Sequence, residues 1–353
     1  MRLWLDKIAS ATANVPLRRD LRVSERIVAR EGYIVAGRIR GEKSAYNQLE
    51  DLHGRMVALH DGDVIAGVLG QRNALHGYSG FLPESLGTGD TLQLLNLGGV
   101  IGKCTSQNPD VGRPFDVELL GAALVFPEFE SRDGVPAHIG MNAIGDGRRD
   151  ATPVPVVFVA GTCMNSGKTL AACRLIRQLA QRGLTVGACK LTGVALRRDT
   201  LQMSDHGAQV AVSFSDAGVV TTTPDNAVRV ARQLFAHLVE RGAQVVVAEL
   251  GDGILGEYGV AQILSDAELK KQAAAIVLCA NDPVGSWGAQ RVMKERFDLP
   301  IDVVSGPTTD NAVGTSYIKQ QLGLEAINAR THARELGDFI AGCLKKRGVE
   351  VGA

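Results

Sequence analysis

Residues Val154 to Ala171 read Val-Pro-Val-Val-Phe-Val-Ala-Gly-Thr-Cys-Met-Asn-Ser-Gly-Lys-Thr-Leu-Ala. The apolar run from Val156 to Ala160 predicts a buried parallel strand, and a helix-period segment follows the polar stretch that ends in Gly167-Lys168-Thr169. Such a loop points backbone N–H groups and the positive end of a helix at an anion. Lys168 would add a point charge, and the Thr169 hydroxyl would ligate Mg²⁺. The stretch therefore predicts a phosphate-binding loop.

The spacing of this loop is irregular. The usual pattern has glycine five residues before Gly167, where this chain has Thr162, and Gly161 stands one position too early. The strand before the loop and the helix after it still favour a nucleotide site over a chance Gly-Lys-Thr. We expect the nucleotide to contact the loop at Gly161, Thr162, Cys163, Met164, Asn165, Ser166, Gly167, Lys168, Thr169 and Leu170.

Composition limits the remaining function classes. The chain has 353 residues, enough for two domains, and its 38 basic residues balance 38 acidic ones. Nothing in this balance favours binding to nucleic acid or to an anionic membrane. The N-terminus lacks the apolar core of a signal peptide and no run is long enough to span a bilayer, so we expect a cytoplasmic protein. The six cysteines are scattered and are expected to be reduced thiols.

The sequence pattern of residues 1–150 predicts a smaller β-rich domain, either a barrel or a sandwich, with a short N-terminal helical segment within residues 1–30. Two similar units, beginning at His60 and Gly87, each contain a Gly-Asp tight turn that leads into a strand. Arg72, Asn73 and His76 lie between glycines, where turn chemistry is favoured over a ligand loop. Strands are expected at residues 33–39, 55–59, 64–69, 91–95, 100–101 and 117–125.

Residues 126–155 have little periodicity and are rich in Gly, Pro and charge. We therefore place the domain boundary near residue 150, and note that a segment of this kind can lie across an active site. Residues 151–353 alternate strand and helix, which predicts a doubly wound, mostly parallel α/β sheet of the P-loop class. Strands are expected at 154–160, 185–190, 244–249, 274–280 and 301–305, and helices at 168–182, 226–241, 265–272, 285–297 and 332–346.

Residues at the ends of four further strands extend the site, because ligands bind at the carboxyl ends of parallel strands. Lys190 ends the second strand, where it can meet a phosphate or a substrate carboxylate. Glu249 ends the third strand in the manner of a Walker-B acid that holds Mg²⁺ or its waters, with Asp252 as a second candidate. Asn281, Pro307 and Asp310 follow the fourth and fifth strands, where the base is expected to bind. The chain has no Asn-Lys-x-Asp guanine motif, which favours ATP over GTP, although the Asp310 carboxylate could still accept a hydrogen bond from a guanine edge.

The pattern Gly-Thr-x-x-x-x-Gly-Lys-Thr resembles the loop of dethiobiotin synthetase and related P-loop enzymes, over roughly residues 154–330. The resemblance implies that Lys168 and Lys190 are catalytic. It also implies that Asp205, in a Ser-Asp segment, holds the metal together with Thr169 and Glu249. Asp199 is the fallback, and His206 is a neighbour rather than a ligand, since imidazole suits Mg²⁺ poorly. Leu191 departs from the family, which has proline after the lysine.

The resemblance implies a function: an ATP- and Mg²⁺-dependent ligase or kinase that phosphorylates a carboxylate-type small molecule. Two alternatives stay open. One is a P-loop GTPase or ATPase switch, or a metallochaperone-type protein, with the β domain as docking module. The other is an acyltransferase that holds a phosphorylated cofactor such as coenzyme A. We expect a small-molecule substrate as partner, and a homodimer or higher homo-oligomer.

Overall fold

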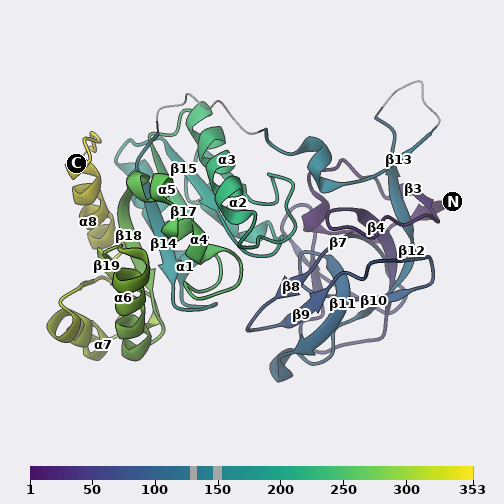
Figure 1. Ribbon diagram of the computed structural model, residues 1–353, viewed down its shortest axis with the longest axis horizontal. Coiled ribbons are helices and arrows are strands. Elements are labelled where there is room, and N and C mark those ends of the chain that lie inside the picture. Colours follow the sequence, from purple (N-terminus) through teal and green to yellow (C-terminus); the bar gives the residue numbers. More distant parts are fainter. Residues whose placement is uncertain (128–132, 146–152, 353) are drawn as a thin grey trace. The chain divides into compact units, whose positions relative to one another are not determined.

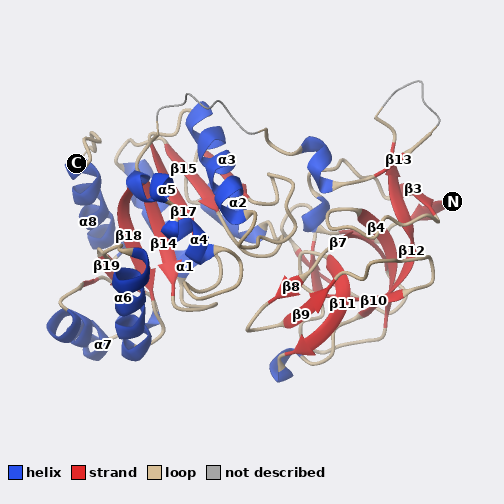
Figure 2. Ribbon diagram, in the orientation of Figure 1, coloured by secondary structure: helices blue, strands red, loops and turns tan. Residues whose placement is uncertain are grey.

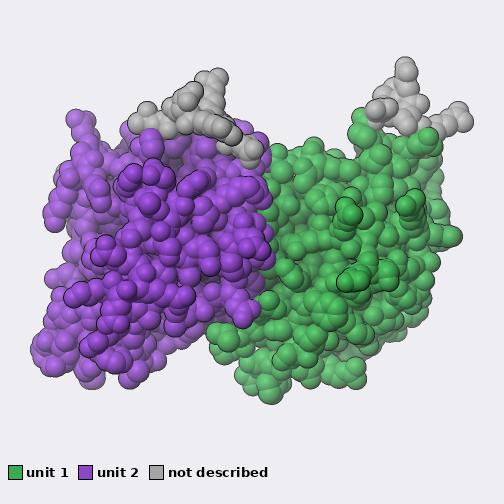
Figure 3. Space-filling model, in the orientation of Figure 1, with its two compact units in different colours: residues 1–143, 194–198, 214–221 green, residues 144–193, 199–213, 222–353 purple. Residues whose placement is uncertain are grey.

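The computed structural model describes residues 1–127, 133–145 and 153–352, which form two compact units (Figures 1 and 3). The first unit comprises residues 1–143, 194–198 and 214–221, and the second comprises residues 144–193, 199–213 and 222–353. Two short segments from the second half of the sequence thus belong to the first unit. A single domain boundary near residue 150 does not describe this division. The predicted connector 126–155 lies partly outside the described residues.

The first unit is built on a closed ring of five strands (Figure 2): β4 (Ile34–Arg40), β7 (Val64–Leu69), β10 (Thr91–Leu94), β11 (Val100–Gln107) and β12 (Asp116–Val125). β4 pairs antiparallel with β7 and β12, and β7 pairs parallel with β11. β10 closes the ring by pairing antiparallel with both β11 and β12. The predicted barrel or sandwich is therefore a barrel, and closure removes the open edges of its sheet.

Side chains alternate between the two faces of the barrel wall. Val35 and Ile39 of β4 point into one hydrophobic cluster with Ile65 of β7, whereas Ile34 and Ala36 belong to a second cluster. Alternation of this kind follows from the two-residue period of a strand. The first cluster fills the barrel, and the second packs its outer wall against the N-terminal segment of the chain.

Shorter elements surround the barrel: β1 (Arg2–Trp4), β2 (Lys7–Ile8), η1 (Ser10–Thr12), β3 (Asp20–Ser24), β5 (Gln48–Glu50), β6 (Met56–Ala58), β8 (Arg72–Asn73), β9 (Tyr78–Phe81), η2 (Pro109–Val111), β13 (Val135–Pro136) and η3 (Ile139–Asn142). The predicted N-terminal helix is wrong. Within residues 20–24, Leu21 and Val23 are buried while Asp20 and Arg22 are exposed, which is strand alternation. Pairing with β1 and β12 fixes this segment as a strand.

Both predicted Gly-Asp turns form. Gly62 and Gly89 have φ of 88° and 87°, which is the left-handed region that glycine adopts readily. Asp63 accepts the N–H of His60 at 2.7 Å, and Asp90 accepts the N–H of Gly87 at 2.8 Å. Each aspartate therefore closes its own turn, as its side-chain chemistry predicts.

The second unit is a parallel sheet of seven strands in the order β16, β15, β17, β14, β18, β19, β20. Every pairing in it is parallel, and the strand before the phosphate loop lies in the middle. This confirms the predicted fold class. The strands are β14 (Val156–Gly161), β15 (Val186–Lys190), β16 (Val210–Ser213), β17 (Val245–Glu249), β18 (Ala273–Cys279), β19 (Val303–Ser305) and β20 (Glu325–Ala326).

Helices cover both faces of this sheet (Figure 2). Leu175 and Ile340 belong to the cluster on one face, while Phe235 packs against Phe158 on the other, with ring centroids 6.2 Å apart. The sequence did not predict β16, β20, α2, α4 or α7. The helical elements are α1 (Lys168–Gln181), α2 (Arg198–Asp205), α3 (Ala227–Glu240), α4 (Val260–Ser265), α5 (Ala267–Gln272), α6 (Pro283–Phe297), η4 (Pro307–Thr309), α7 (Ala312–Tyr317), η5 (Ile318–Leu322) and α8 (Ala333–Lys346). Across the described residues, every helix is too short or too polar to span a membrane.

Candidate nucleotide-binding site

The phosphate loop joins β14 to α1. Gly167 precedes the helix with φ of 90°, and Asn165 also has a left-handed φ of 60°. These two positions curl the chain so that α1 begins directly at Lys168. A helix N-terminus that opens from a tight loop exposes several backbone N–H groups together, and that is the arrangement that binds phosphate.

The irregular glycine spacing has a steric explanation. A Cβ at Gly161 would lie 2.4 Å from Ser166 Oγ and 2.8 Å from Lys168 Cδ. Glycine is therefore needed one position earlier than usual, because the lysine side chain passes over residue 161. Thr162 at the usual glycine position is half-buried and lies within the same loop.

Lys168 is turned into the loop. Its Nζ donates to Cys163 O at 2.7 Å, and Ser166 Oγ donates to the same carbonyl at 3.0 Å. Burial lowers the pKa of Lys168, the charge of Glu249 opposes that shift, and the nearby ammonium of Lys190 adds to it. An anion in the loop would supply the negative charge that this buried ammonium lacks.

Glu249, at the end of β17, connects the phosphate loop to the end of β15. It is 1% exposed, and its Oε1 accepts Thr169 Oγ1 at 3.0 Å and Lys190 Nζ at 3.3 Å. Burial alone would lower the pKa of Lys190, but the charges of Asp199 and Glu249 outweigh burial and hold that pKa above its usual value. The side chains predicted from three separate sequence positions thus lie together at the carboxyl edge of the sheet.

Asp199 and Asp205 lie at opposite ends of α2. Asp199 is buried in the first turn and forms an ion pair with Lys190, whereas Asp205 is exposed in the last turn. Six residues of helix span about 9 Å, which separates the two carboxylates along the helix axis. The fallback residue is therefore the one beside Lys190. The metal-binding role of Asp205 stays a prediction.

Two glycines allow the strand ends to meet. A Cβ at Gly251 would lie 2.0 Å from Thr192 O, and a Cβ at Gly253 would lie 2.5 Å from Thr162 O. The loop after β17 is thus in backbone contact with the loop after β15 and with the phosphate loop. Between these glycines, Asp252 is mostly buried and has a left-handed φ of 68°. The position of Asp252 after the third strand is evident from the sequence, but the backbone packing on either side of it is not.

The residues around Thr169 suit Mg²⁺. Glu249 Oε2 is buried and has no hydrogen-bond partner among the described residues, and it stands beside a hydroxyl oxygen at a strand end. Mg²⁺ takes hard oxygen ligands, often one or two carboxylates completed by phosphate oxygens and waters. No group of three His, Cys, Asp or Glu side chains in the described chain forms a metal cage by itself. Thr169 and Glu249 are the residues that would hold the ion.

The loops predicted to bind the base also border the phosphate loop. Asn281 Nδ2 donates to Cys163 Sγ at 3.1 Å, and a Cβ on Gly167 would lie 3.7 Å from Pro307 Cδ. Asp310 is exposed, and its Oδ1 accepts Asn328 Nδ2 at 2.8 Å. Asn281 and Pro307 are therefore next to the loop, while Asp310 is held by the strand-end region after β20.

Comparisons with known proteins find fold-level similarity alone. No protein-family model matches the sequence, and no curated protein matches it. The signal recognition particle receptor FtsY from Elizabethkingia anophelis aligns with 14% identity and a TM-score of 0.39, over 58% of this chain and 68% of that one. A duf1611 family protein from Anabaena variabilis aligns with 15% identity and a TM-score of 0.40, over 54% of this chain and 58% of that one.

A third similar structure is the hydrogenase maturation factor HypB from Archaeoglobus fulgidus, with 16% identity and a TM-score of 0.35, over 54% of this chain and 90% of that one. These matches cover little more than half of this chain and assign it to no particular family. At such low similarity they carry no inference about activity. The P-loop nucleotide-binding character of the second unit rests instead on its own sheet order, loop and strand-end residues.

Proposed function

We propose that this chain is an ATP- and Mg²⁺-dependent phosphotransferase that activates the carboxylate of a small molecule. The observation that supports this best is the second lysine: Lys190 lies at the end of β15, within 3.3 Å of the same Glu249 oxygen that binds Thr169. A loop lysine is enough to bind a nucleotide. A further ammonium at this edge suits an anionic acceptor or the phosphoryl group in transit.

The residue roles follow from charge and position. The loop N–H groups and Lys168 would hold the β- and γ-phosphates, while Lys190 would neutralise charge that develops on the transferred phosphoryl. Thr169 and Glu249 would hold Mg²⁺, which would offset the negative charge of the phosphates. Asp199 would orient Lys190 through their ion pair. This work is positional and electrostatic and needs no protein nucleophile.

The proposed reaction consists of two successive displacements. A carboxylate oxygen of the acceptor bonds to the γ-phosphorus while the bond from that phosphorus to the bridging oxygen breaks, and ADP leaves with the electron pair. An amine then attacks the acyl carbon, and phosphate leaves with the former carboxylate oxygen and the electron pair of the bond that breaks. The proton that the amine nitrogen loses goes to the departing phosphate. A kinase would stop after the first displacement.

The test traces the carboxylate oxygens of the acceptor instead of measuring a reaction rate. The full chain is incubated with ATP, Mg²⁺ and a panel of small carboxylates that carry a heavy-oxygen label, with and without amines. Transfer moves the label from the acceptor into phosphate or into an isolable acyl phosphate. Phosphate that takes its new oxygen from water in every reaction would refute the transfer reaction while leaving nucleotide hydrolysis intact.

A second candidate, a nucleotide-dependent switch, is favoured by one observation. Residues 194–198, shortly after Lys190, and residues 214–221, directly after β16, belong to the barrel unit. Within that unit, fully buried Glu50 accepts the Arg197 N–H at 2.8 Å, and Asn96 Nδ2 donates to Ala195 O at 2.8 Å. The segment between Lys190 and Asp199 is thus bound within the barrel unit. A nucleotide-dependent movement of Lys190 or Asp199 would therefore act on this segment through the chain.

Hydrogen exchange distinguishes this candidate from the first. A switch should change the exchange of residues 194–198 and 214–221 when a non-hydrolysable triphosphate replaces the diphosphate, with no small acceptor present. Equal exchange in the two nucleotide states would exclude the switch. Glu50→Gln keeps an acceptor for Arg197 and serves as the matched variant, whereas Glu50→Ala removes it.

A further inference from the structure

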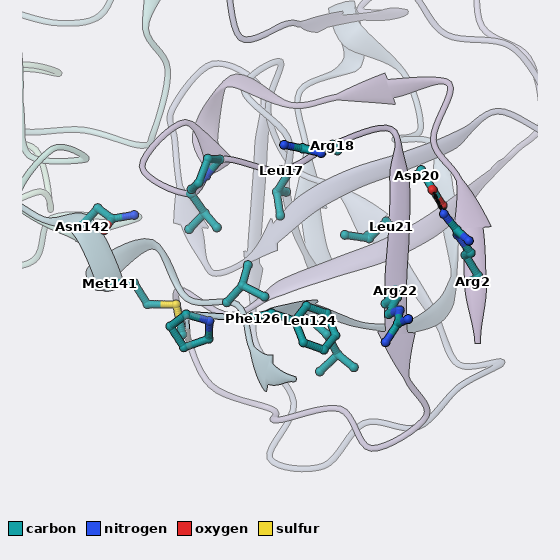
Figure 4. Close-up of a pocket in the computed structure, with 14 residues that line it drawn as sticks. Arg2, Leu17, Arg18, Asp20, Leu21, Arg22, Leu124, Phe126, Met141 and Asn142 are labelled. Carbon is teal, nitrogen blue, oxygen red and sulfur yellow. Dashed lines mark hydrogen bonds and ion pairs between the residues drawn. The ribbon is translucent and has the colours of Figure 1, made fainter. Parts of the chain in front are cut away.

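A separate cavity lies in the barrel unit, between β3, the end of β12 and η3 (Figure 4). Its volume is about 820 Å³, within the range of small-molecule sites. The described residues that line it all belong to the first unit, and none of them takes part in the nucleotide site. The sequence pattern does not predict this cavity, because its walls come from Arg2, residues 15–18 and 20–22, and residues 124–127 more than a hundred positions later, together with η3.

The walls are largely apolar. Figure 4 shows Leu17, Leu21 and Leu124 around one space, with Phe126 and Met141 at its border. Leu17 and Leu21 are anchored in the outer cluster of the barrel, whereas Phe126 is 37% and Met141 44% exposed. The buried leucines give the cavity a fixed floor, and the exposed side chains offer apolar surface to an occupant.

The charges at the border are unbalanced. Arg2 donates to both carboxylate oxygens of Asp20, so the guanidinium of Arg2 already has a carboxylate partner. Arg22 lies over the Phe126 ring, with its guanidinium carbon 5.1 Å from the centroid. Arg18 is exposed and forms no hydrogen bond or ion pair with the described part of the chain. Asp20 is the one carboxylate among the described lining residues, and it is hydrogen-bonded to Arg2 and interacts with Arg22 through charge alone. The three lining guanidinium groups of Arg2, Arg18 and Arg22 therefore outnumber the carboxylate, and the border carries excess positive charge.

We propose that this cavity binds an amphipathic organic anion, of which a medium-chain carboxylate is the simplest member. The apolar tail would lie on Leu17, Leu21 and Leu124, and the head would meet Arg18 and Arg22. Guanidinium groups form charge-assisted, often bidentate hydrogen bonds with carboxylates, which fixes the head as well as attracting it. A neutral ligand would leave both arginines unmatched, and a cation would be repelled by them. The proposal does not rest on the proposed phosphotransferase.

The first experiment uses the unaltered full chain without nucleotide. Calorimetric titration with octanoate should saturate at about millimolar concentration or below, and octanol, with the same tail and no charge, should bind at least about tenfold more weakly. Added salt should weaken octanoate and spare octanol. Acetate and octyltrimethylammonium should not bind. Equal affinity for octanoate and octanol would overturn the proposal without any variant having to fold.

Variants locate the site. Arg18→Glu with Arg22→Glu should weaken octanoate at least about tenfold, whereas Arg19→Glu makes the same charge change on an exposed neighbour that does not line the cavity. Octanoate should also slow peroxide oxidation of the Met141 thioether to its sulfoxide, and leave exposed Met1 unaffected. Unchanged octanoate affinity in the folded double variant, or equal protection of Met1 and Met141, would place binding elsewhere and reject the site.

Discussion

Lys190 and Thr169 bind the same oxygen of Glu249, at 3.3 Å and 3.0 Å. The second oxygen of this carboxylate is buried and lacks a hydrogen-bond partner among the described residues. A cation held by Thr169 and Glu249 would therefore stand next to the Lys190 ammonium. Like charges so close repel, so Lys190 should weaken the metal site while it supports the transferred phosphoryl.

Lys190→Met should separate these two effects. The variant keeps the length of the side chain and removes its charge, so Mg²⁺ should bind about tenfold more tightly without nucleotide, because a neighbouring positive charge is lost. Turnover should fall by about a hundredfold or more, as expected when a charge-stabilising group is removed. Mg²⁺ titration of the thermal midpoint and a steady-state phosphate assay measure the two quantities.

The same variant leaves Asp199 and Glu249 without their shared cation, which should cost about 3 kcal/mol of unfolding free energy in metal-free buffer. Mg²⁺ should restore much of this loss. Lys271→Met is the control, because Lys271 is a highly exposed partner of Glu268 and is expected to change little. Unaltered Mg²⁺ affinity in Lys190→Met would contradict the repulsion argument.

Lys168→Ala should abolish stabilisation by nucleotide. Saturating ATP with Mg²⁺ should stabilise the unaltered chain by about 2.7 kcal/mol at a hundred times the dissociation constant. The variant loses the ammonium that lies within the loop, 2.7 Å from Cys163 O, and should show almost no shift. Thermal unfolding with and without ATP measures this. A full nucleotide shift in the folded variant would show that the nucleotide binds outside this loop.

Much of the site was predictable because its residues follow local rules. An apolar strand that ends in a loop and a helix fixes Lys168 and Thr169, and the strand ends deliver Lys190 and Glu249 to one edge of a parallel sheet. The resemblance places Asp205 ahead of Asp199 as a metal ligand, and sequence spacing alone does not tell which turn of α2 faces Lys190. Whether Asp205 holds a metal remains a prediction.

Contacts between residues that lie far apart in the sequence were harder to predict. The closure of the barrel depends on β10 meeting both β11 and β12, and the N-terminal segment becomes a strand because β12 pairs with it. Residues 194–198 are bound within the barrel unit by partners far earlier in the chain, among them Glu50, which lies 147 positions before Arg197. Local periodicity carries no information on such partners.

Gly251→Ala should disturb the site through sterics alone. The added methyl would lie 2.0 Å from Thr192 O, so the loops after β15 and β17 must separate. We expect a loss of about 2 kcal/mol in unfolding free energy, together with strongly reduced turnover. Gly342→Ala is the matched control, since nothing lies within 4 Å of its added methyl in α8. That change should raise stability by up to about 1 kcal/mol, because alanine favours helix. Equal effects of the two substitutions in urea unfolding would refute close loop packing.

Asp302→Asn should stabilise the chain increasingly as pH rises. Burial raises the pKa of Asp302, and the Ile276 N–H, Lys346 and Arg347 oppose that shift only in part. The unfolded carboxyl therefore loses its proton at lower pH than the folded one, so the unaltered chain loses stability as pH rises through the folded pKa. Asparagine has no such cost and can still accept the Ile276 N–H, which Asp302 binds at 2.7 Å. The advantage should stay below about 1 kcal/mol, because the group is partly exposed.

Asp266→Asn should behave in the opposite way. Burial raises the pKa of Asp266, but the hydrogen bonds from Arg232 and from the start of α5 outweigh it and hold the pKa below its usual value. Its stabilising effect is present above the unfolded pKa and is lost as pH falls, so this variant should be weaker at neutral pH and approach the unaltered chain in acid. Urea unfolding of both variants from about pH 4 to about pH 8 compares the slopes. Slopes of the same sign would contradict the assignment of burial as the dominant cause at Asp302 and of Arg232 pairing at Asp266.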